Sequence, residues 1–343
     1  MTLPASIASR LRLPLIAAPM LRVSGPDLVS AVCRQGVIGS FPTVNARSAD
    51  ELDAWLSRIQ ADAAAHDGPC APACPNLIMR SDPAKLAADV QVLVRQRVEV
   101  VIASVGSPEA VIAPLHGVGC LVLADVASME HVHKALDAGV DGMVLLSAGA
   151  GGNTGWVNGL AFVRAVREMY DGPLGLAGGI SDGAALLAAQ VLGCDFALMG
   201  TRFIATTESL ASAEYQAMLV SSRIDDIALT RGISGLEANF LRPSLLANDL
   251  DPEELAKPLS AEQARERFGA YSANLRGPRR WLDLWSAGHT VSAVRQTHSV
   301  RNLVDSVAEE YRQARSRLQQ VTAADTVMMW TEWGCRDAPP STL

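Results

Sequence analysis

Residues 174–203 read LGLAGGISDGAALLAAQVLGCDFALMGTRF, and this stretch contains the repeating unit of the chain. A short apolar run at 174–177 leads into a Gly-Gly turn, and a segment with helical spacing follows at about 182–192. Gly193 ends that segment, and a second apolar run lies at 196–199. Uniformly apolar runs of about four to eight residues are typical of strands buried on both faces, as in parallel sheets. The stretch therefore predicts a strand, a turn, a helix and another strand.

The same unit recurs along the chain up to about residue 208. The apolar runs that predict strands are Leu15–Met20, Val37–Pro42, Pro75–Met79, Val98–Val105, Gly119–Ala124, Gly142–Ser147, Leu174–Ala177 and Phe196–Met199. The segments that predict helices lie near 24–34, 49–65, 83–96, 108–116, 128–138, 160–170 and 182–192. Eight strands alternating with helices over roughly 200 residues indicate a (β/α)8 TIM barrel, an α/β fold. A doubly wound open sheet is the alternative, but units of such even spacing favour closure.

The pattern changes after about residue 208. Residues 209–280 contain helical segments and polar turns without a further strand–turn–helix unit, so we expect a smaller, mostly helical cap domain over the barrel mouth. Residues 298–319 predict one long amphipathic helix that packs back on the barrel. The predicted barrel domain is therefore 1–208 together with about 281–343, and the cap is 209–280. The pattern gives no placement for residues 321–343.

Composition and charge exclude several classes of protein. About half of the chain (49%) is apolar, and 29 basic against 36 acidic side chains leave a net charge of −7. The apolar content argues against disorder, and an acidic chain without a basic cluster argues against nucleic-acid binding. Six cysteines without a complete zinc pattern favour free thiols, so we expect no metal site. Because no apolar run reaches about 18 residues, we expect no membrane span and a cytoplasmic protein.

The turns after the seventh and eighth predicted strands carry the clearest functional signal. Gly178-Gly179 and Gly200-Thr201 lie where barrel enzymes commonly bind phosphate through backbone N–H groups. Glycine lets the backbone approach the phosphate oxygens, and the Thr201 hydroxyl can add a hydrogen bond. Tight turns without a ligand are the alternative. The coincidence of both turns with the two expected strands favours a phosphate site.

A second glycine-rich loop, GAGGNTG at 149–155, follows the sixth predicted strand. Its small residues allow a flat ligand to approach closely. The loop is not a P-loop, because it lacks Gly-Lys-Ser/Thr, and it is not a dinucleotide fingerprint, because Thr154 takes the third glycine position. Asn153 and Thr154 are its only side chains that can hydrogen-bond a substrate.

A set of motifs in this order resembles the nitronate monooxygenase family, formerly the 2-nitropropane dioxygenases. They are Ala18-Pro19-Met20, the Asn76 strand, Gly151-Gly152-Asn153-Thr154-Gly155, Ala177-Gly178-Gly179-Ile180, Met199-Gly200-Thr201-Arg202-Phe203, Ile233–Phe240 and Trp285–Gly288. The resemblance covers about residues 12 to 290. It implies a barrel that binds FMN noncovalently without a metal, under a helical second domain.

The resemblance also implies which residues hold the cofactor. The expected FMN-binding residues are Ala18, Pro19, Met20, Asn76, Asp125, Gly151, Gly152, Ala177, Gly178, Gly179, Gly200 and Thr201, with the phosphate on the last four of these and the flavin ring on the first three. Position 125 is a Lys in some members and an Asp here. Asp125 either accepts hydrogen bonds from ribityl hydroxyls or caps the following turn, and both alternatives stay open.

The chain departs from the family pattern at position 153. Nitronate-oxidising members typically carry a His there, whereas this chain has Asn153, whose amide accepts no proton near neutral pH. The amide can still orient a nitro, carbonyl or nitronate oxygen, and an anionic nitronate needs no base. We therefore expect Asn153 and Thr154 to be catalytic. His289 lies in a segment that approaches the active site in the family, so we expect it to bind substrate.

The leading hypothesis is an FMN-dependent monooxygenase that oxidises anionic alkyl nitronates with O2. One alternative is an FMN-dependent NAD(P)H reductase of a quinone or an enoyl thioester, with Arg202, Arg231 or Arg242 as nucleotide contacts. Another is a flavin-binding protein without turnover. The expected partners are a small-molecule substrate and O2, with no nucleic acid. The apolar tail near Trp330 and Trp333 could cover the barrel or a second subunit, so a homodimer is an alternative to a monomer.

Overall fold

The computed structural model describes residues 3–268 and 278–323, and its centre is a closed barrel of parallel strands. In ring order the strands are β1 (Leu15–Ala17), β2 (Ile38–Pro42), β3 (Ala73–Ile78), β4 (Val100–Ser104), β5 (Leu121–Val126), β6 (Gly142–Leu146), β8 (Leu174–Ala177) and β9 (Phe196–Met199). β9 pairs with β1, with Leu198 opposite Ile16, and this pairing closes the ring. The predicted TIM barrel is confirmed, and the open sheet is excluded.

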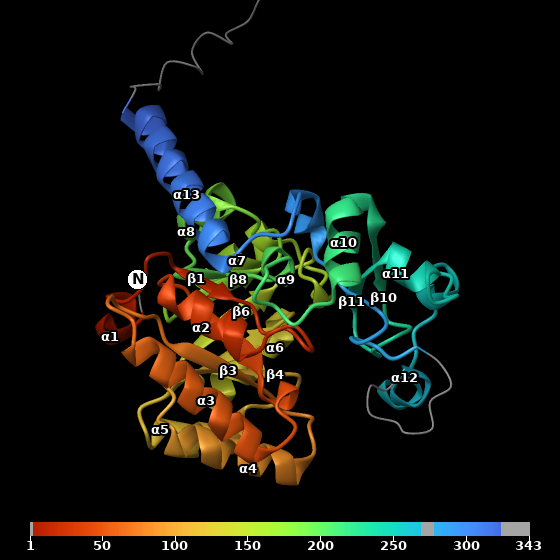
Figure 1. The fold of residues 1–343 in the computed structure, drawn as a ribbon, viewed down its shortest axis with the longest axis horizontal. Helices are drawn as coiled ribbons and strands as arrows, with labels where there is room; N and C mark the ends of the chain where they lie inside the picture. Colours follow the sequence, from red (N-terminus) through yellow and green to blue (C-terminus); the bar gives the residue numbers. More distant parts are fainter. Residues whose placement is uncertain (1–2, 269–277, 324–343) are drawn as a thin grey trace, which may run out of the picture.

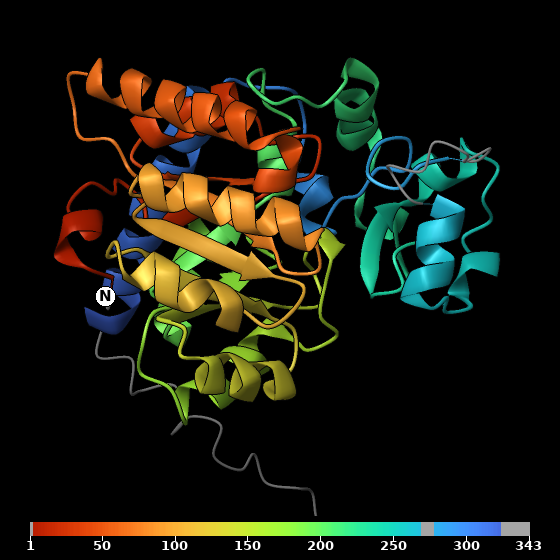
Figure 2. The same ribbon diagram turned by 90° about the horizontal axis from the view of Figure 1, so that it is seen from below.

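Helices surround the barrel (Figures 1 and 2). They are α2 (Pro26–Arg34), α3 (Ala49–Ala64), α4 (Pro83–Arg95), α5 (Glu109–His116), α6 (Met129–Ala138), α7 (Gly159–Arg167) and α8 (Gly183–Leu192), with the short α9 (Thr201–Ile204) after β9 and the 3-10 turn η1 (Thr43–Asn45) after β2. At the start of α8 the Asp182 side chain accepts a hydrogen bond from the Ala185 N–H over 2.8 Å, and Gly193 ends the helix with φ +116°. Both features follow the capping preferences of these residue types.

Buried apolar side chains fill the barrel interior. Leu3 and Ile7, on and beside the short helix α1 (Ala5–Ala8), belong to the same cluster, so the N-terminal segment plugs one end of the barrel. The other members include Ile16, Ile38, Cys74, Val100, Ile102, Leu123, Val144, Phe196 and Leu198. The barrel is therefore a packed core, as in other TIM barrels, and a ligand must bind at its rim.

The long helix α13 (Val300–Ala323) packs on α8 and projects beyond the barrel (Figure 1). Its side chains Val300, Leu303, Val304 and Val307 are at most 1% exposed. Gly183 permits the close approach, because a Cβ there would lie 2.0 Å from the Tyr311 nitrogen. The predicted C-terminal helix is thus confirmed. The tail with Trp330 and Trp333 lies outside the described residues.

The cap lies beside the barrel mouth (Figure 2). It contains α10 (Ala213–Ser221), η2 (Ile224–Asp226), β10 (Ile227–Thr230), β11 (Ala238–Leu241), α11 (Arg242–Leu246), η3 (Glu254–Ala256) and α12 (Ala261–Phe268). β10, β11 and the short strand β7 (Gly152–Asn153) form an antiparallel sheet that the sequence analysis did not predict. Residues 284–294, which include η4 (His289–Ala293), pack in the same buried clusters as the cap, whereas the domain boundary expected from the sequence places them with the barrel.

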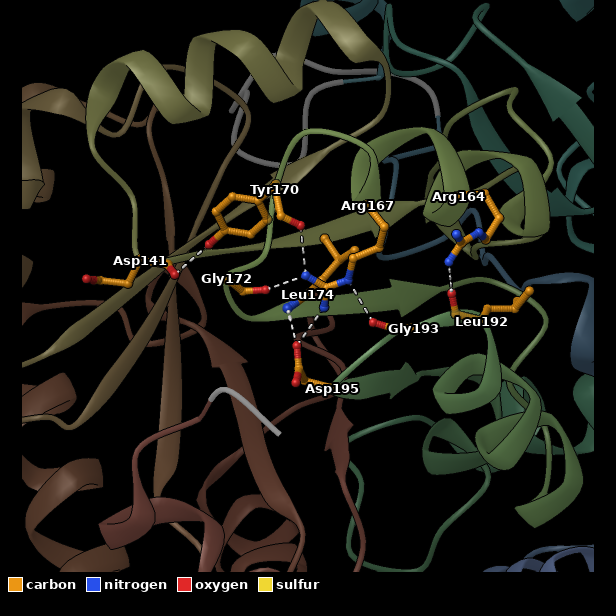
Figure 3. Close-up of polar contacts among 9 residues, drawn as sticks. All are labelled: Asp141, Arg164, Arg167, Tyr170, Gly172, Leu174, Leu192, Gly193 and Asp195. Carbon is orange, nitrogen blue, oxygen red and sulfur yellow. Dashed lines mark hydrogen bonds and ion pairs between the residues drawn. The ribbon is translucent and has the colours of Figure 1, made fainter.

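A buried ion pair ties α7 to the amino ends of β8 and β9 (Figure 3). The Arg167 guanidinium lies 2.7 Å from the Asp195 carboxylate, and the side chains are 13% and 7% exposed. Arg167 also donates to three backbone carbonyls, those of Tyr170, Gly172 and Gly193. This end of a barrel commonly serves stability and not catalysis.

Candidate active site

A cavity of about 210 Å³ lies at the carboxyl ends of the barrel strands, under the cap; we call it the barrel-mouth cavity. All the residues predicted to bind the cofactor line it: Ala18, Pro19, Met20, Asn76, Asp125, Gly151, Gly152, Ala177, Gly178, Gly179, Gly200 and Thr201. They come from the ends of six strands and the loops that follow them. The fold thus brings together residues that are up to 183 positions apart (18 to 201).

The turn at Gly178-Gly179 forms an open cradle of backbone donors. Both glycines have positive φ, +104° and +80°, which residues with a side chain rarely adopt. A Cβ on Gly178 would lie 2.4 Å from the Ser147 Oγ, whereas no atom lies within 4 Å of a Cβ on Gly179. Within the described residues, no protein oxygen accepts a hydrogen bond from the N–H groups of Gly178, Gly179 or Thr201. These donors suit an anionic group such as a flavin phosphate.

Thr201 connects this cradle to the cap. Its buried hydroxyl oxygen accepts a hydrogen bond from the Gly288 N–H over 2.9 Å. The hydroxyl proton stays available to a ligand, because a hydroxyl can accept and donate at the same time. A phosphate at the cradle would therefore be held from the barrel side by a residue that the cap positions.

The glycine-rich loop packs directly against the cap. A Cβ on Gly151 would lie 2.6 Å from the Gly288 nitrogen, so only glycine allows this approach. Asn239 on β11 donates from its side chain to the carbonyl of Ala150 over 2.7 Å. The Thr154 hydroxyl donates to the Ser147 carbonyl over 2.8 Å and ties the two ends of the loop together. Thr154, which the sequence predicts to be catalytic, does not line the barrel-mouth cavity. Its hydroxyl instead holds the loop in its conformation.

Asn153 does line the cavity, and its side-chain oxygen is buried without a hydrogen-bond partner among the described residues. Buried polar atoms are nearly always paired, because an unpaired one costs about 1–3 kcal/mol. The pairing of β7 with β11, where Asn153 lies opposite Ala238, fixes the backbone at this position. The amide is therefore a preformed polar contact for a ligand in the cavity.

Asp125, at the end of β5, is the one acidic side chain of the cavity lining within the described residues. Burial raises its pKa to about 6, while hydrogen bonds from the Ser104 hydroxyl and the Val105 N–H oppose this rise. Ser104 is itself held by Asn76, whose amide donates to the Ser104 Oγ over 2.6 Å. Asn76 thus supports a neighbouring side chain as well as lining the cavity.

Aromatic side chains of the cap cover the cavity on one side. The sequence motifs identify only part of this group as candidate site residues. Trp281 stacks on Phe240 and Trp285 stacks on Tyr215, with ring centroids 5.0 Å apart in each pair. Trp281, Trp285 and Tyr215 line the cavity, and Trp281 lies against Gly152. Only Trp285 stood in a motif. The other two have no local pattern, and their position depends on how the cap folds.

The remaining candidates lie away from the cavity. His289 is exposed and does not line the cavity, although its neighbours Gly288 and Thr290 do. Its ring packs near Gly149. Arg202 donates to the Ser181 carbonyl, and Arg242 lies near Glu253. A second, larger cavity of about 900 Å³ adjoins the first between α5, α6 and the cap; we call it the side cavity, and Arg231 lines it.

The sequence matches the family model described as nitronate monooxygenase over residues 5–310. The chain belongs to the nitronate monooxygenase family. As a member of the nitronate monooxygenase family it is an oxidoreductase of a flavin-dependent group, and the free backbone N–H groups of the cradle fit a flavin nucleotide.

Relatives within and around the nitronate monooxygenase family differ in their reactions. A nitronate monooxygenase of Paraburkholderia phytofirmans is 29% identical, and the match spans 90% of this chain and 94% of that protein. A Mycobacterium tuberculosis protein named (3aS,4S,5R,7aS)-5-hydroxy-7a-methyl-1-oxo-octahydro-1H-indene-4-carboxyl-CoA dehydrogenase is 27% identical over 68% of this chain, and the match spans 64% of that protein. The solved nitroalkane oxidase of Streptomyces ansochromogenes, 24% identical, has the same fold, with a TM-score of 0.76 over 92% of this chain and 100% of its own.

No helix in the described part of the chain is long and apolar enough to cross a bilayer.

Proposed function

We propose that this protein is an FMN-dependent nitronate monooxygenase that oxidises anionic alkyl nitronates with O2. The observation that carries the proposal is the position of the Asn153 amide in the wall of the barrel-mouth cavity, whose lining contains every residue expected to bind the flavin. The family match supports a flavin, and the free N–H groups of Gly178, Gly179 and Thr201 form one compact set of donors that suits a single phosphate group, as in FMN.

The residues would divide the work as follows. The N–H groups of Gly178 and Gly179 and the Thr201 hydroxyl would hold the phosphate, and Ala18, Pro19 and Met20 would support the ring. FMN, when bound, supplies the redox chemistry by taking electrons from the substrate and passing them to O2. Asn153 would orient the substrate by a hydrogen bond from its amide NH2 to a nitronate oxygen.

The cavity favours a small substrate over a pyridine nucleotide. Within the described residues its lining contains no Lys or Arg to pair with a dinucleotide phosphate. The stacked pairs Trp281–Phe240 and Trp285–Tyr215 lie on the cap side of the cavity, and three of their four rings line it. An alkyl nitronate has a small apolar body and one polar end, which matches a mostly apolar lining that offers the Asn153 amide as a polar contact.

Anaerobic stopped-flow mixing tests the proposal. The flavin-loaded protein is mixed with propionate 3-nitronate, an alkyl nitronate, NADH or NADPH, and the visible flavin band is followed. Rapid bleaching by the nitronates alone is expected, and the chromophore released by denaturation should be FMN. Bleaching by NADH or NADPH and not by nitronates would assign the protein to the reductases.

A variant at Asn153 tests the role of the amide. Asn153→Ala should lower the rate of bleaching by nitronate about 100-fold, the usual effect of losing one oriented hydrogen bond to developing charge. Asn302→Ala, an exposed position on α13, is the control and should react like the wild type. Equal rates in all three proteins would remove Asn153 from the mechanism.

A further inference from the structure

Proton transfer in the barrel-mouth cavity needs a group that exchanges a proton near neutral pH. The described lining contains two ionisable side chains, Asp125 and Tyr215. The Tyr215 hydroxyl donates to the Ser286 carbonyl, and burial raises the pKa of Tyr215 to about 12. Asn153 carries an amide, which takes up no proton in this range. Asp125 is the remaining candidate.

Asp125 is held in place by hydrogen bonds that run across neighbouring strands. Asn76 on β3 donates to Ser104 on β4, and the Ser104 hydroxyl and the Val105 N–H bond to the Asp125 carboxyl on β5. Val105 has φ +57°, which a β-branched residue adopts only when the surroundings enforce it. Strain of this kind concentrates at functional sites, and here it lies in the cavity wall beside the carboxyl.

Asp125 also has a route to water. Asp125 and Asn153 both line the barrel-mouth cavity and the side cavity, so the two cavities meet at these side chains. The side cavity reaches the surface, where it is bordered by Trp156, which is 72% exposed, and by the exposed residues Arg80 and Arg231. A proton taken from a ligand in the first cavity can therefore leave through the second.

We propose that Asp125 is a general base that removes the α-hydrogen of a neutral nitroalkane, so that the enzyme accepts this neutral form as well as the nitronate. The inference rests on the proposed function. A carboxylate oxygen takes the α-hydrogen as a proton, the C–H electron pair forms the C=N bond, and one N=O pair moves onto oxygen. The products are the nitronate and a neutral carboxylic acid, which returns its proton to water in the side cavity.

The charge state of Asp125 suits this role. With a pKa of about 6, the carboxyl is mostly ionised at pH 7 and is a stronger base than an ordinary carboxylate. The charged and titratable groups that line the side cavity with it are mixed in sign: Arg80, Glu109, His131, Lys134, Asp137, Arg231 and Glu237. Because a base must be ionised to act, the rate of proton removal should rise with pH through about 6.

Hydrogen exchange at the α-carbon measures this step without oxidation. The flavin-loaded protein is incubated anaerobically with excess nitroethane in D2O, and loss of the α-hydrogen signal is followed by proton NMR against a protein-free sample. The wild type should catalyse exchange, and Asp125→Asn should lower the catalysed rate by about 100-fold or more. Asp171→Asn, an exposed carboxyl that lines neither cavity, is the matched control and should exchange like the wild type.

A second variant protects the test against a folding or flavin-binding defect of Asp125→Asn. Ser104→Ala removes a hydrogen bond that lowers the pKa of Asp125, so the pH midpoint of exchange should move upward. Absence of exchange in the wild type, an unchanged rate in a folded Asp125→Asn protein, or an unmoved midpoint would each overturn the assignment. If nitronates fail to bleach the flavin while exchange persists, the proposed function falls and the base remains. If nitronates bleach the flavin but no exchange occurs, the proposed function is supported and the assignment of Asp125 as the base is overturned.

Discussion

Gly178 is the single residue on which the phosphate cradle depends most directly. Gly178→Ala would place a methyl group 2.4 Å from the Ser147 Oγ and 2.8 Å from the Ala150 nitrogen, at a φ of +104°. The turn must then shift, so the variant should lose its flavin during gel filtration while staying folded. The measurement is the ratio of flavin absorbance to protein absorbance, with the dissociation constant of added FMN.

Gly139→Ala is the matched control for this change. Gly139 also has positive φ, +81°, but it ends α6 on the outside of the barrel, and no atom lies within 4 Å of an added Cβ. Its replacement should cost about 1 kcal/mol of stability through backbone strain alone. Flavin should be retained. If both variants keep their flavin, the cradle is not the phosphate site.

The cavity residues differ in how far sequence could reveal them. Gly178 follows β8 and Asn76 lies in β3, and the strand period alone brings the carboxyl ends of such strands to one rim. No such rule predicts the positions of Trp281 and Tyr215, because they reach the cavity through stacking inside the cap. The hydroxyl of Thr154 could have faced a substrate as readily as the loop backbone, and only the folded loop decides between them.

At the scale of elements, the ion pair of Arg167 and Asp195 should carry much of the stability of the α7, β8 and β9 unit. Arg167→Met leaves a carboxylate that is 7% exposed without its guanidinium, and breaking a buried pair costs about 3–5 kcal/mol. We expect a loss of this size in urea denaturation, with unchanged flavin affinity at the opposite end of the barrel.

Arg164→Met provides the comparison on the same helix. Arg164 is exposed and donates to the Leu192 carbonyl (Figure 3). Surface changes of this kind usually alter stability by less than about 1 kcal/mol. Equal losses in the two variants would mean that the ion pair adds nothing to the helix contact.

Elements with a strong local period were predictable, and short elements with distant partners were not. The barrel strands are uniformly apolar and recur evenly, and α13 has an amphipathic pattern over many turns. β10 and β11 have four residues each and β7 has two, so no period can develop in them. The pairing of β7 with β11 places Asn153 opposite Ala238, 85 positions away in sequence (153 to 238). No local pattern can predict a contact over this separation.

At the scale of the whole molecule, barrel and cap should respond together to the cofactor. The β7–β11 pairing, the Asn239 side chain and the bond from Gly288 to Thr201 join the phosphate cradle to the cap. Loading with FMN should therefore slow amide hydrogen exchange in residues 147–155, 238–241 and 285–290 together. Helix α4, on the outside of the barrel, serves as the internal reference. Slowing confined to the barrel turns would show that the cap moves independently.

Strand β7 belongs to a barrel loop but completes the cap sheet, and this arrangement limits how parts of related proteins can be exchanged. A gene fragment covering the cap alone would arrive without Gly152 and Asn153, the two residues that complete its antiparallel sheet. Chimeras between relatives should then fold only when residues 147–155 and the cap come from the same parent. Substrate preference would thus depend on two separate pieces of sequence, residues 147–155 and the cap, which have to come from the same parent.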